Sequence, residues 1–223
     1  MSHFFWPSTC PVCGRLGTAS CPHCLDSLLS RMPDRCLFCG GGPYPCGIPS
    51  HLTYARAGTW HEGLGRDIVH LAKYSGRRNL AFEMGKALAR LYREEKGSIL
   101  VPVPLHRNSI RLFNQAEWIA RGMSEVWEGD VLDGLRWTKP VPSQVGRNAF
   151  ERRAIQKGAF SWNLGDVKQP VFLVDDVFTT GTTLLRAAET LAQSGISVKG
   201  AYTWGLSPIG ALTVKWKEDA VLV

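Results

Sequence analysis

The residues best suited to chemistry stand at the end of an apolar run late in the chain. Residues 171–174 are all apolar, and Asp175 and Asp176 follow directly. Two carboxylates at the end of a buried strand need partners, because an unpaired buried charge is costly. Ligands of open α/β sheets lie beyond the carboxyl ends of the strands. The pair therefore predicts a ligand, either the hydroxyls of a diol or a magnesium ion with its waters.

A cluster of threonines around one glycine follows the acids and leads into a predicted helix. The N-terminus of a helix offers unpaired N–H donors and partial positive charge, so it attracts phosphate. Glycine lets the backbone approach an anion, and hydroxyls add donors. The alternative is a threonine that only caps the helix. Neither a Walker loop nor a dinucleotide fingerprint is present. The predicted phosphate-binding residues are Thr179, Thr180, Gly181, Thr182 and Thr183.

All seven cysteines lie between residues 10 and 46. Two closely spaced C-x-x-C turns can complete a tetrahedral zinc shell. The N-terminus does not resemble a signal peptide and no apolar run is long enough to span a membrane, so we expect a cytoplasmic protein with reduced thiols. The odd count also argues against disulfides. The predicted ligands of this structural zinc site are Cys10, Cys13, Cys21 and Cys24.

The other cysteines form a weaker pattern. Cys36, Cys39 and Cys46 lack a fourth cysteine, although His51 could complete a second metal site. The alternative is that the three thiols pack as small hydrophobic side chains.

The elements that must position these residues alternate between helix and strand. A strand, a helix and a strand in succession near the C-terminus predict a βαβ unit, and hence an α/β fold with a parallel sheet. Leu64, Ile68 and Leu71 recur at helical spacing. We predict helices over 61–78, 79–97, 115–127 and 182–193, strands over 98–103, 171–177 and 196–206, and an irregular segment over 129–150.

The length and composition suit a globular protein. A chain of 223 residues can hold one sizeable α/β domain and a small attachment, which we place at 53–223 and 1–52. With 44% hydrophobic and 20% charged residues, disorder is excluded. The net charge of +7 favours anionic partners such as phosphates or nucleic acid, or is simply charge that keeps the protein soluble.

The run VFLVDDVFTTGTT (171–183) closely resembles the phosphoribosyl-pyrophosphate (PRPP) loop of type I phosphoribosyltransferases. The whole chain resembles the ComF/GntX branch of that superfamily. The segments 71–89, 101–120 and 143–160 and the N-terminal C-x-x-C pairs carry this match. The resemblance implies a type I phosphoribosyltransferase fold, in which helices flank a parallel sheet, with a small N-terminal Cys-rich zinc module.

The resemblance also implies roles for individual residues. Asp175 and Asp176 would bind the ribose hydroxyls of PRPP with magnesium close by, and the threonine cluster would cradle the 5-phosphate. Pro104 and Arg107 would belong to the loop on the pyrophosphate side. A basic flap would cover the site, although its charges could equally form a solvated surface; the residues are Arg147, Arg152, Arg153 and Lys157.

Two positions depart from the family pattern. Relatives commonly have glycine where this chain has Leu112, which puts any glycine-dependent contact there in doubt. Type I enzymes that act on 6-oxopurines carry an acid where this chain has Thr179, and threonine cannot act as a general acid or base near neutral pH. We therefore do not expect oxopurine salvage, and no stretch of the sequence indicates a pocket for an accepting base.

The resemblance implies a role in DNA uptake during natural transformation. Incoming single-stranded DNA could be handled by a PRPP-binding protein of this kind, and some of the eight tryptophans could stack on bases. Two other functions stay open. One is an active phosphoribosyltransferase with an unidentified acceptor. The other is a non-catalytic PRPP or nucleotide sensor that docks on a DNA-uptake helicase or another competence protein. The oligomeric state does not follow from the sequence.

Overall fold

The computed structural model describes residues 9–18, 20–37, 54–93, 96–106, 109–138 and 158–208. Several residues singled out in the sequence lie outside these ranges. They are Cys39, Cys46, His51, Arg107, Arg147, Arg152, Arg153 and Lys157.

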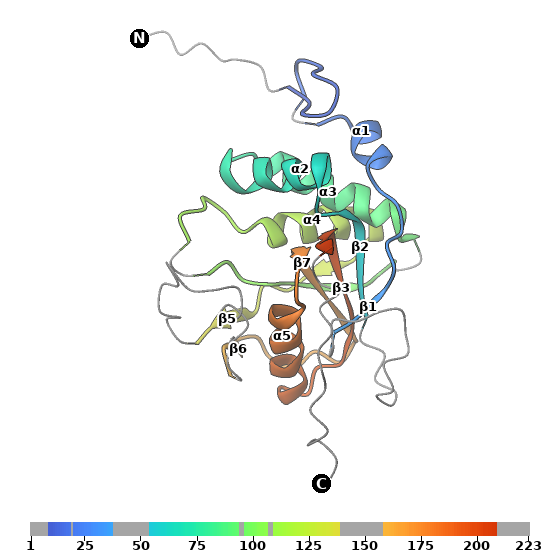
Figure 1. The fold of residues 1–223 in the computed structure, drawn as a ribbon. Helices are drawn as coiled ribbons and strands as arrows, with labels where there is room; N and C mark the ends of the chain where they lie inside the picture. The colour runs from blue at the N-terminus through green and yellow to red at the C-terminus, as the bar shows by residue number, and fades with distance from the viewer. Residues whose placement is uncertain are drawn as a thin grey trace.

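A six-stranded sheet forms the centre of the described structure (Figure 1). Its order is β1-β2-β8-β7-β3-β4, and every neighbouring pair is parallel except β1 and β2. This confirms the predicted α/β class with a mostly parallel sheet. The strands are β1 (Arg35–Cys36), β2 (Tyr54–Trp60), β3 (Ile99–Pro102), β4 (Asp130–Val131), β7 (Val171–Phe178) and β8 (Val198–Leu206).

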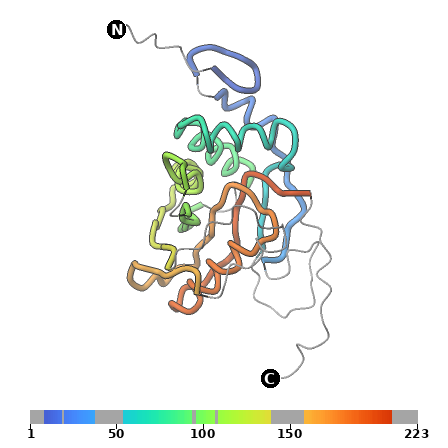
Figure 2. Tube along the Cα trace, turned by 60° about the vertical axis from the view of Figure 1, so that its left-hand side comes forward, coloured from blue at the N-terminus to red at the C-terminus, as the bar shows by residue number. Residues whose placement is uncertain are grey.

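Helices cover both faces of the sheet (Figures 1 and 2). One face carries α2 (Gly63–Tyr74), α3 (Arg78–Leu91) and α4 (Gln115–Trp127), and the short α1 (Pro22–Ser27) packs on α3. The other face carries α5 (Thr182–Gln193) and a small antiparallel sheet of β5 (Leu135–Trp137) and β6 (Phe160–Trp162).

Strand β7 is buried on both faces because its apolar side chains alternate between two cores. Phe172 and Val174 pack with the helices α2–α4, whereas Val171 and Leu173 pack with α5. A parallel strand covered by helices on both sides has a continuous apolar sequence, as this one does. The acids that end the run therefore emerge at the carboxyl edge of the sheet.

Helices α3 and α4 approach each other closely at two glycines. A Cβ atom on Gly85 would lie 2.0 Å from the carbonyl oxygen of Ile119, and one on Gly122 would lie 2.0 Å from that of Phe82. Any side chain at either position would push the helices apart, and overpacking of this kind costs about 1–3 kcal/mol. The two glycines therefore set how near α4 lies to α3.

The predicted helices are found, with two corrections. Helix α3 ends at Leu91 rather than at Gly97. Leu64 does not face the core but is 49% exposed, and the buried positions of α2 are instead Gly65, Ile68, Val69 and Ala72. Helices α4 and α5 have the predicted bounds.

The strands were predicted less completely. The segment 129–150 was expected to be irregular, yet β4 and β5 lie within its described part. Strands β2 and β6 were not predicted either. Among the described residues, none of the helices combines the length and the apolar character that a membrane crossing requires.

The N-terminal segment is joined to the sheet through β1, in which Arg35 and Cys36 pair with Ala55 and Tyr54 of β2. The proposed division of the chain at residue 52 stays a prediction, since that stretch lies outside the described ranges.

Candidate functional site

Asp175 and Asp176 lie in the C-terminal half of β7, which ends two residues later at Phe178, beside the end of β3 and the C-terminal half of β8. Pro102 of β3 pairs with Val174, and Thr203 of β8 pairs with Asp175. The acids line a pocket of about 250 Å³. Its other walls come from the segment after β3, from Trp137 and from the start of α5; the lining residues include Pro104, His106, Ser109, Arg111, Asn114 and Thr183. The structure thus brings the acids, Pro104 and one of the predicted threonines to one cavity.

Two cations contact Asp176. The Nζ atom of Lys73, on α2, lies 3.0 Å from Oδ1, and Nη1 of Arg111 lies 3.7 Å from Oδ2. The side chains of Lys73 and Asp176 are only 15% and 13% exposed. Water therefore screens this ion pair far less than it screens a pair at the surface.

Asp175 has a different environment. Burial, followed by the charge of Asp176, raises its pKa to about 7, although the N–H of Asp176 donates to its Oδ1 at 2.8 Å and stabilises the charged form. The two adjacent carboxyls are therefore unequal: Asp176 pairs with Lys73 and Arg111, and Asp175 can hold a proton near neutral pH.

The segment before α4 holds Arg111 in place. Asn114 caps the helix by accepting from the N–H of Ala116, and its amide donates to the carbonyl of Val103 at 2.9 Å. The buried Gln115 accepts from Arg111 Nη1 at 3.2 Å and donates to the carbonyl of Ala72 at 3.4 Å. Gln115 thereby connects Arg111 to α2, the helix that carries Lys73.

Leu112 does not occupy a position that needs glycine. Its side chain is exposed, and among the described residues other than glycine only Glu128 has a positive φ. The departure from the family pattern at this position therefore leaves the backbone of the loop unstrained.

The threonine turn opens α5, as the sequence predicted. Gly181 has φ 77°, and a Cβ atom there would lie 2.7 Å from the ring of Phe178, so this position requires glycine. Thr179 and Thr180 are exposed, and the hydroxyls of Thr180 and Thr182 lie 3.0 Å apart. The N-cap residue, Gly181, has no side chain to cap the helix, but the hydroxyl of Thr180 accepts from the N–H of Thr182 at 3.5 Å, so the alternative of a capping threonine stays open.

The resemblance implies magnesium near the acid pair, and the carboxylates as placed do not fit it. Magnesium in such sites uses one or two carboxylates together with ligand phosphates and waters. Three of the four carboxylate oxygens already have partners: Asp175 Oδ1 accepts an N–H, and both oxygens of Asp176 face cations. Protein groups therefore already contact the carboxylate oxygens that a magnesium ion would need as ligands.

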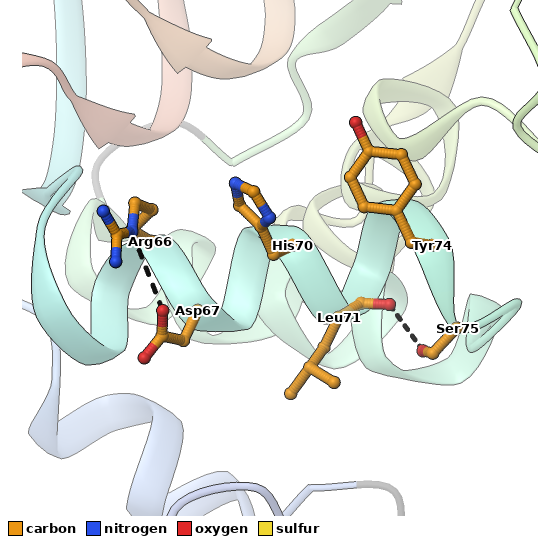
Figure 3. A pocket seen from close by; sticks show the side chains of 6 residues that line it. All are labelled: Arg66, Asp67, His70, Leu71, Tyr74 and Ser75. Atoms are coloured by element: carbon orange, nitrogen blue, oxygen red, sulfur yellow. Dashed lines mark hydrogen bonds and ion pairs between the residues drawn. The ribbon is translucent and has the colours of Figure 1, made fainter.

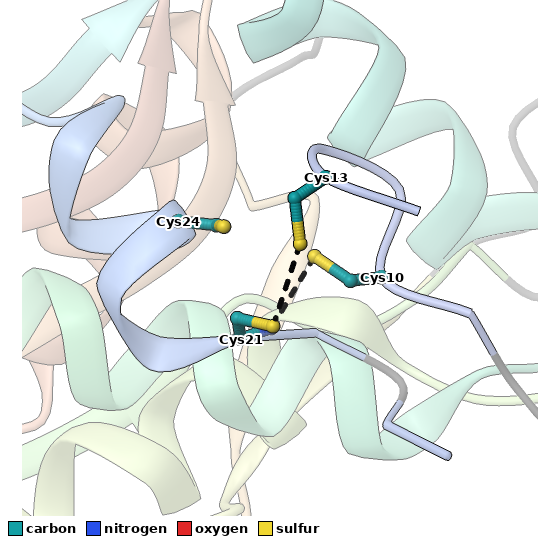
Figure 4. A group of neighbouring side chains, drawn as sticks. All are labelled: Cys10, Cys13, Cys21 and Cys24. Atoms are coloured by element: carbon teal, nitrogen blue, oxygen red, sulfur yellow. Dashed lines mark hydrogen bonds between the residues drawn. The ribbon is translucent and has the colours of Figure 1, made fainter. Parts of the chain in front are cut away.

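The predicted cysteine cluster is present. The sulfur atoms of Cys10, Cys13, Cys21 and Cys24 lie within 4.8 Å of one another and point toward a common centre (Figure 4). Cys13 and Cys21 are 3.7 Å apart, close to the edge of about 3.8 Å of a tetrahedron with zinc–sulfur bonds of about 2.3 Å. The donor set fits zinc, and with four thiolates it would leave no position open for water.

The thiols of this cluster differ in acidity. Burial alone would raise the pKa of Cys10, but backbone N–H groups of Cys13, Cys21 and Val12 bring it down to about 6. The hydrogen bond with Cys13, together with burial and the negative charge nearby, raises the pKa of Cys24 to about 12. Four thiols gathered without a cation repel one another once ionised, which is the condition that a bound dication relieves.

The second predicted metal site is not tested. Cys36 lies in β1 and is buried, while Cys39, Cys46 and His51 fall outside the described ranges. The same holds for Arg107 and the four basic residues of the proposed flap, so their roles stay predictions.

Sequence reasoning missed Lys73 and His61. His61 follows β2, and its buried Nδ1 has no hydrogen-bond partner among the described residues. Burial and then the charge of Lys73 lower the pKa of His61. Both lie far from β7 in the sequence, and a lysine in the last turn of a helix carries no signal of its own.

A larger hollow of about 630 Å³ lies along α2, away from the predicted site residues (Figure 3). His70 and Tyr74 point to one side of the helix and Leu71 to the other. The rings of His70 and Tyr74 are 5.7 Å apart, and Tyr74 is 61% exposed. The lining residues are Arg66, Asp67, His70, Leu71, Tyr74 and Ser75.

Comparison with known proteins adds two similarities. The chain is 26% identical to competence protein ComFC of Streptococcus pneumoniae over 81% of its own length and 78% of that protein. It is 34% identical to competence protein F of Haemophilus influenzae over 48% of its length, a match that spans 49% of that relative. No protein-family model matches the chain. Both relatives are named competence proteins, which agrees with the resemblance to the ComF family that the sequence motifs carry.

The cysteine cluster predicts one tightly bound zinc ion per chain. Cys24→Ser should remove that ion and lower the melting temperature, because the metal holds the N-terminal loop to α1. Elemental analysis and thermal melts measure both. Ser27→Ala, in the same short helix but without a ligand, serves as the control. A chain purified under reducing conditions without zinc would contradict the prediction, and a second ion would indicate the site of Cys36, Cys39, Cys46 and His51.

The raised pKa of Asp175 predicts that stability falls as pH rises. The folded state holds this proton more tightly than the unfolded chain, since the pKa moves from 3.8 to about 7. The free energy of unfolding should therefore decrease between those two values and level off above them. Asp175→Asn should flatten this slope in urea titrations across the pH range. The exposed Asp133→Asn is the control, and an unchanged slope in Asp175→Asn would refute the assignment.

Proposed function

We propose that the chain binds the ribose phosphate part of PRPP, or a related sugar phosphate, at the carboxyl edge of β7. The observation that carries the proposal is the meeting of two unlike groups in one small cavity: the acid pair and the start of α5. Carboxylates accept hydrogen bonds from a diol, and the N-terminus of α5 offers N–H donors to a phosphate.

The surrounding residues support the same ligand. Arg111 lines the cavity together with His106, Ser109 and Asn114. A guanidinium group is well suited to phosphate oxygens, and hydroxyl and amide groups suit the rest of a polar ligand. Pro104 also lines the cavity, and the pyrophosphate end of PRPP would lie on its side.

We infer further that this binding serves DNA uptake. Both relatives are named competence proteins, and the net charge of +7 favours a nucleic-acid partner. The row formed by Arg66, His70 and Tyr74 on α2 offers one cation and two rings spaced four residues apart, so they share a face of the helix. Such a row can stack on the bases of single-stranded DNA.

The tryptophans contribute less to this surface than their number suggested. Trp127 and Trp204 are fully buried, and Trp60, at 38%, is the most exposed of those in the described ranges. The aromatic contact with bases would therefore come from α2.

An active phosphoribosyltransferase is the second candidate. Thr179 stands exposed where an oxopurine enzyme has its acid, so a different acceptor would be required. Release of pyrophosphate from PRPP across a panel of nitrogen acceptors separates this candidate from a non-catalytic sensor, which would bind PRPP and release none.

Replacing both acids should abolish the sugar phosphate site. The double variant Asp175→Asn, Asp176→Asn is expected to bind PRPP at least about tenfold more weakly in calorimetry, because charged acceptors for the diol are lost. Asp133→Asn, an exposed acid on the β4–β5 connection, should bind like the unmodified protein. Undiminished binding by a folded double variant would rule out this site.

Binding of single-stranded DNA should weaken as salt rises and should depend on α2. The double variant His70→Ala, Tyr74→Ala is expected to lose about 1–3 kcal/mol of binding free energy in fluorescence anisotropy, the usual contribution of a stacked base. Leu164→Ala removes an exposed apolar side chain beyond β6 and serves as the control. Absence of salt-dependent binding by the unmodified protein would remove the DNA part of the proposal.

A further inference from the structure

Two cations already compensate the acid pair without a metal ion. Lys73 and Arg111 contribute two positive charges, and the acids contribute at most two negative ones, fewer when Asp175 holds its proton. A divalent cation that bound these carboxylates would meet two resident cations at close range. It would gain little attraction unless one of them left.

Lys73 is well placed to remain where it is. Its ammonium group lies 3.0 Å from Asp176 Oδ1 and is mostly buried between α2 and β7. Withdrawing the lysine would leave Asp176 buried with only the longer contact to Arg111, at 3.7 Å. Leaving a buried charge with a weakened partner is strongly unfavourable.

Arg111 is also fixed. Its Nη1 is shared between Asp176 and Gln115 Oε1, and the amide of Gln115 donates to backbone carbonyls of Phe113 and Ala72. The guanidinium group has five donors in a planar fork, so those not used here can face a phosphate in the cavity. An ammonium group likewise has three donors.

We propose that Lys73 and Arg111 supply the positive charge that magnesium would otherwise bring to this site, so that the sugar phosphate binds without a divalent cation. This inference rests on the proposed function, because it concerns the same ligand. Lys73 acts as a positioning residue: its ion pair holds the Asp176 carboxylate in the wall of the cavity, where it can accept from the ligand hydroxyls.

The proposal makes metal dependence the quantity to measure. The probe is ribose 5-phosphate, which lacks the pyrophosphate group and so binds magnesium weakly in solution. Calorimetric titrations with EDTA and with excess magnesium chloride are compared for the unmodified protein. We expect the two dissociation constants to agree within about twofold. Titration of magnesium chloride alone should give no site.

Substitution of Lys73 should make the binding of ribose 5-phosphate depend on magnesium. In EDTA, Lys73→Met is expected to bind ribose 5-phosphate about tenfold more weakly, the change expected when one charge-assisted interaction is lost. Magnesium should restore this affinity, since the vacated place can then take a cation. Lys73→Arg keeps the charge and should behave like the unmodified protein. Lys86→Met removes a lysine paired with Glu125 on the remote α3–α4 surface and is the matched control.

The outcomes separate this inference from the function on which it rests. If the unmodified protein binds ribose 5-phosphate or PRPP only with magnesium, the inference is wrong and the proposed function stands. If Lys73→Met folds and binds as tightly as the unmodified protein in EDTA, the role of Lys73 is refuted. If neither ligand binds in either buffer, both proposals fail. Should Lys73→Met not fold, the comparison of the unmodified protein and Lys73→Arg in the two buffers decides the question.

Discussion

Two neighbouring carboxyl groups at the end of a strand that is buried on both faces impose a charge requirement on everything around them. Strand β7 runs through the middle of the sheet between β3 and β8, so water cannot solvate these groups freely. The structure meets the requirement unequally. Burial and the charge of its neighbour favour the neutral form of Asp175, whereas Asp176 lies between the cations of Lys73 and Arg111.

This charge balance depends on the layer of helices above the sheet. Lys73 belongs to α2, and Arg111 is held by the segment that starts α4. Gln115 connects the two through its bond to the backbone of α2. The close approach of α3 and α4 at Gly85 and Gly122 sets the position of α4, so packing between two helices bears on the geometry of the site. The binding of a ligand by the acids would therefore depend on how α2, α3 and α4 pack.

The cysteine cluster lies beside the short helix α1, which packs on the same layer of helices. Helix α1, which begins directly after Cys21, buries Leu25 in the core formed by α2–α4, and Asp26 pairs with Arg90 of α3. A zinc ion held by the four thiolates would fix the loop before α1 and thereby dock that helix. The family resemblance places such a module beside a PRPP-type loop, and the structure shows that both border one helical layer.

Local sequence patterns determined much of the fold. The apolar run of β7 and the strand–helix–strand order predict a parallel α/β sheet, since these signals act within a few residues of one another. The short strands β4, β5 and β6 were missed because two or three residues of extended chain carry no periodicity. The predicted burial of Leu64 was wrong because helical spacing alone does not show how far the rest of the protein covers an apolar stripe.

The same distinction applies to the candidate site. The sequence by itself determined that an acid pair meets a threonine turn at the end of β7 and that four cysteines can share a zinc ion, because each of these patterns lies within a short stretch of chain. Only the tertiary structure decided that Lys73 neutralises Asp176, that Gln115 connects Arg111 to α2 and that Asp175 holds its proton near neutral pH. Charge compensation depends on distance in space and on burial, and neither can be read from the separation of residues along the chain.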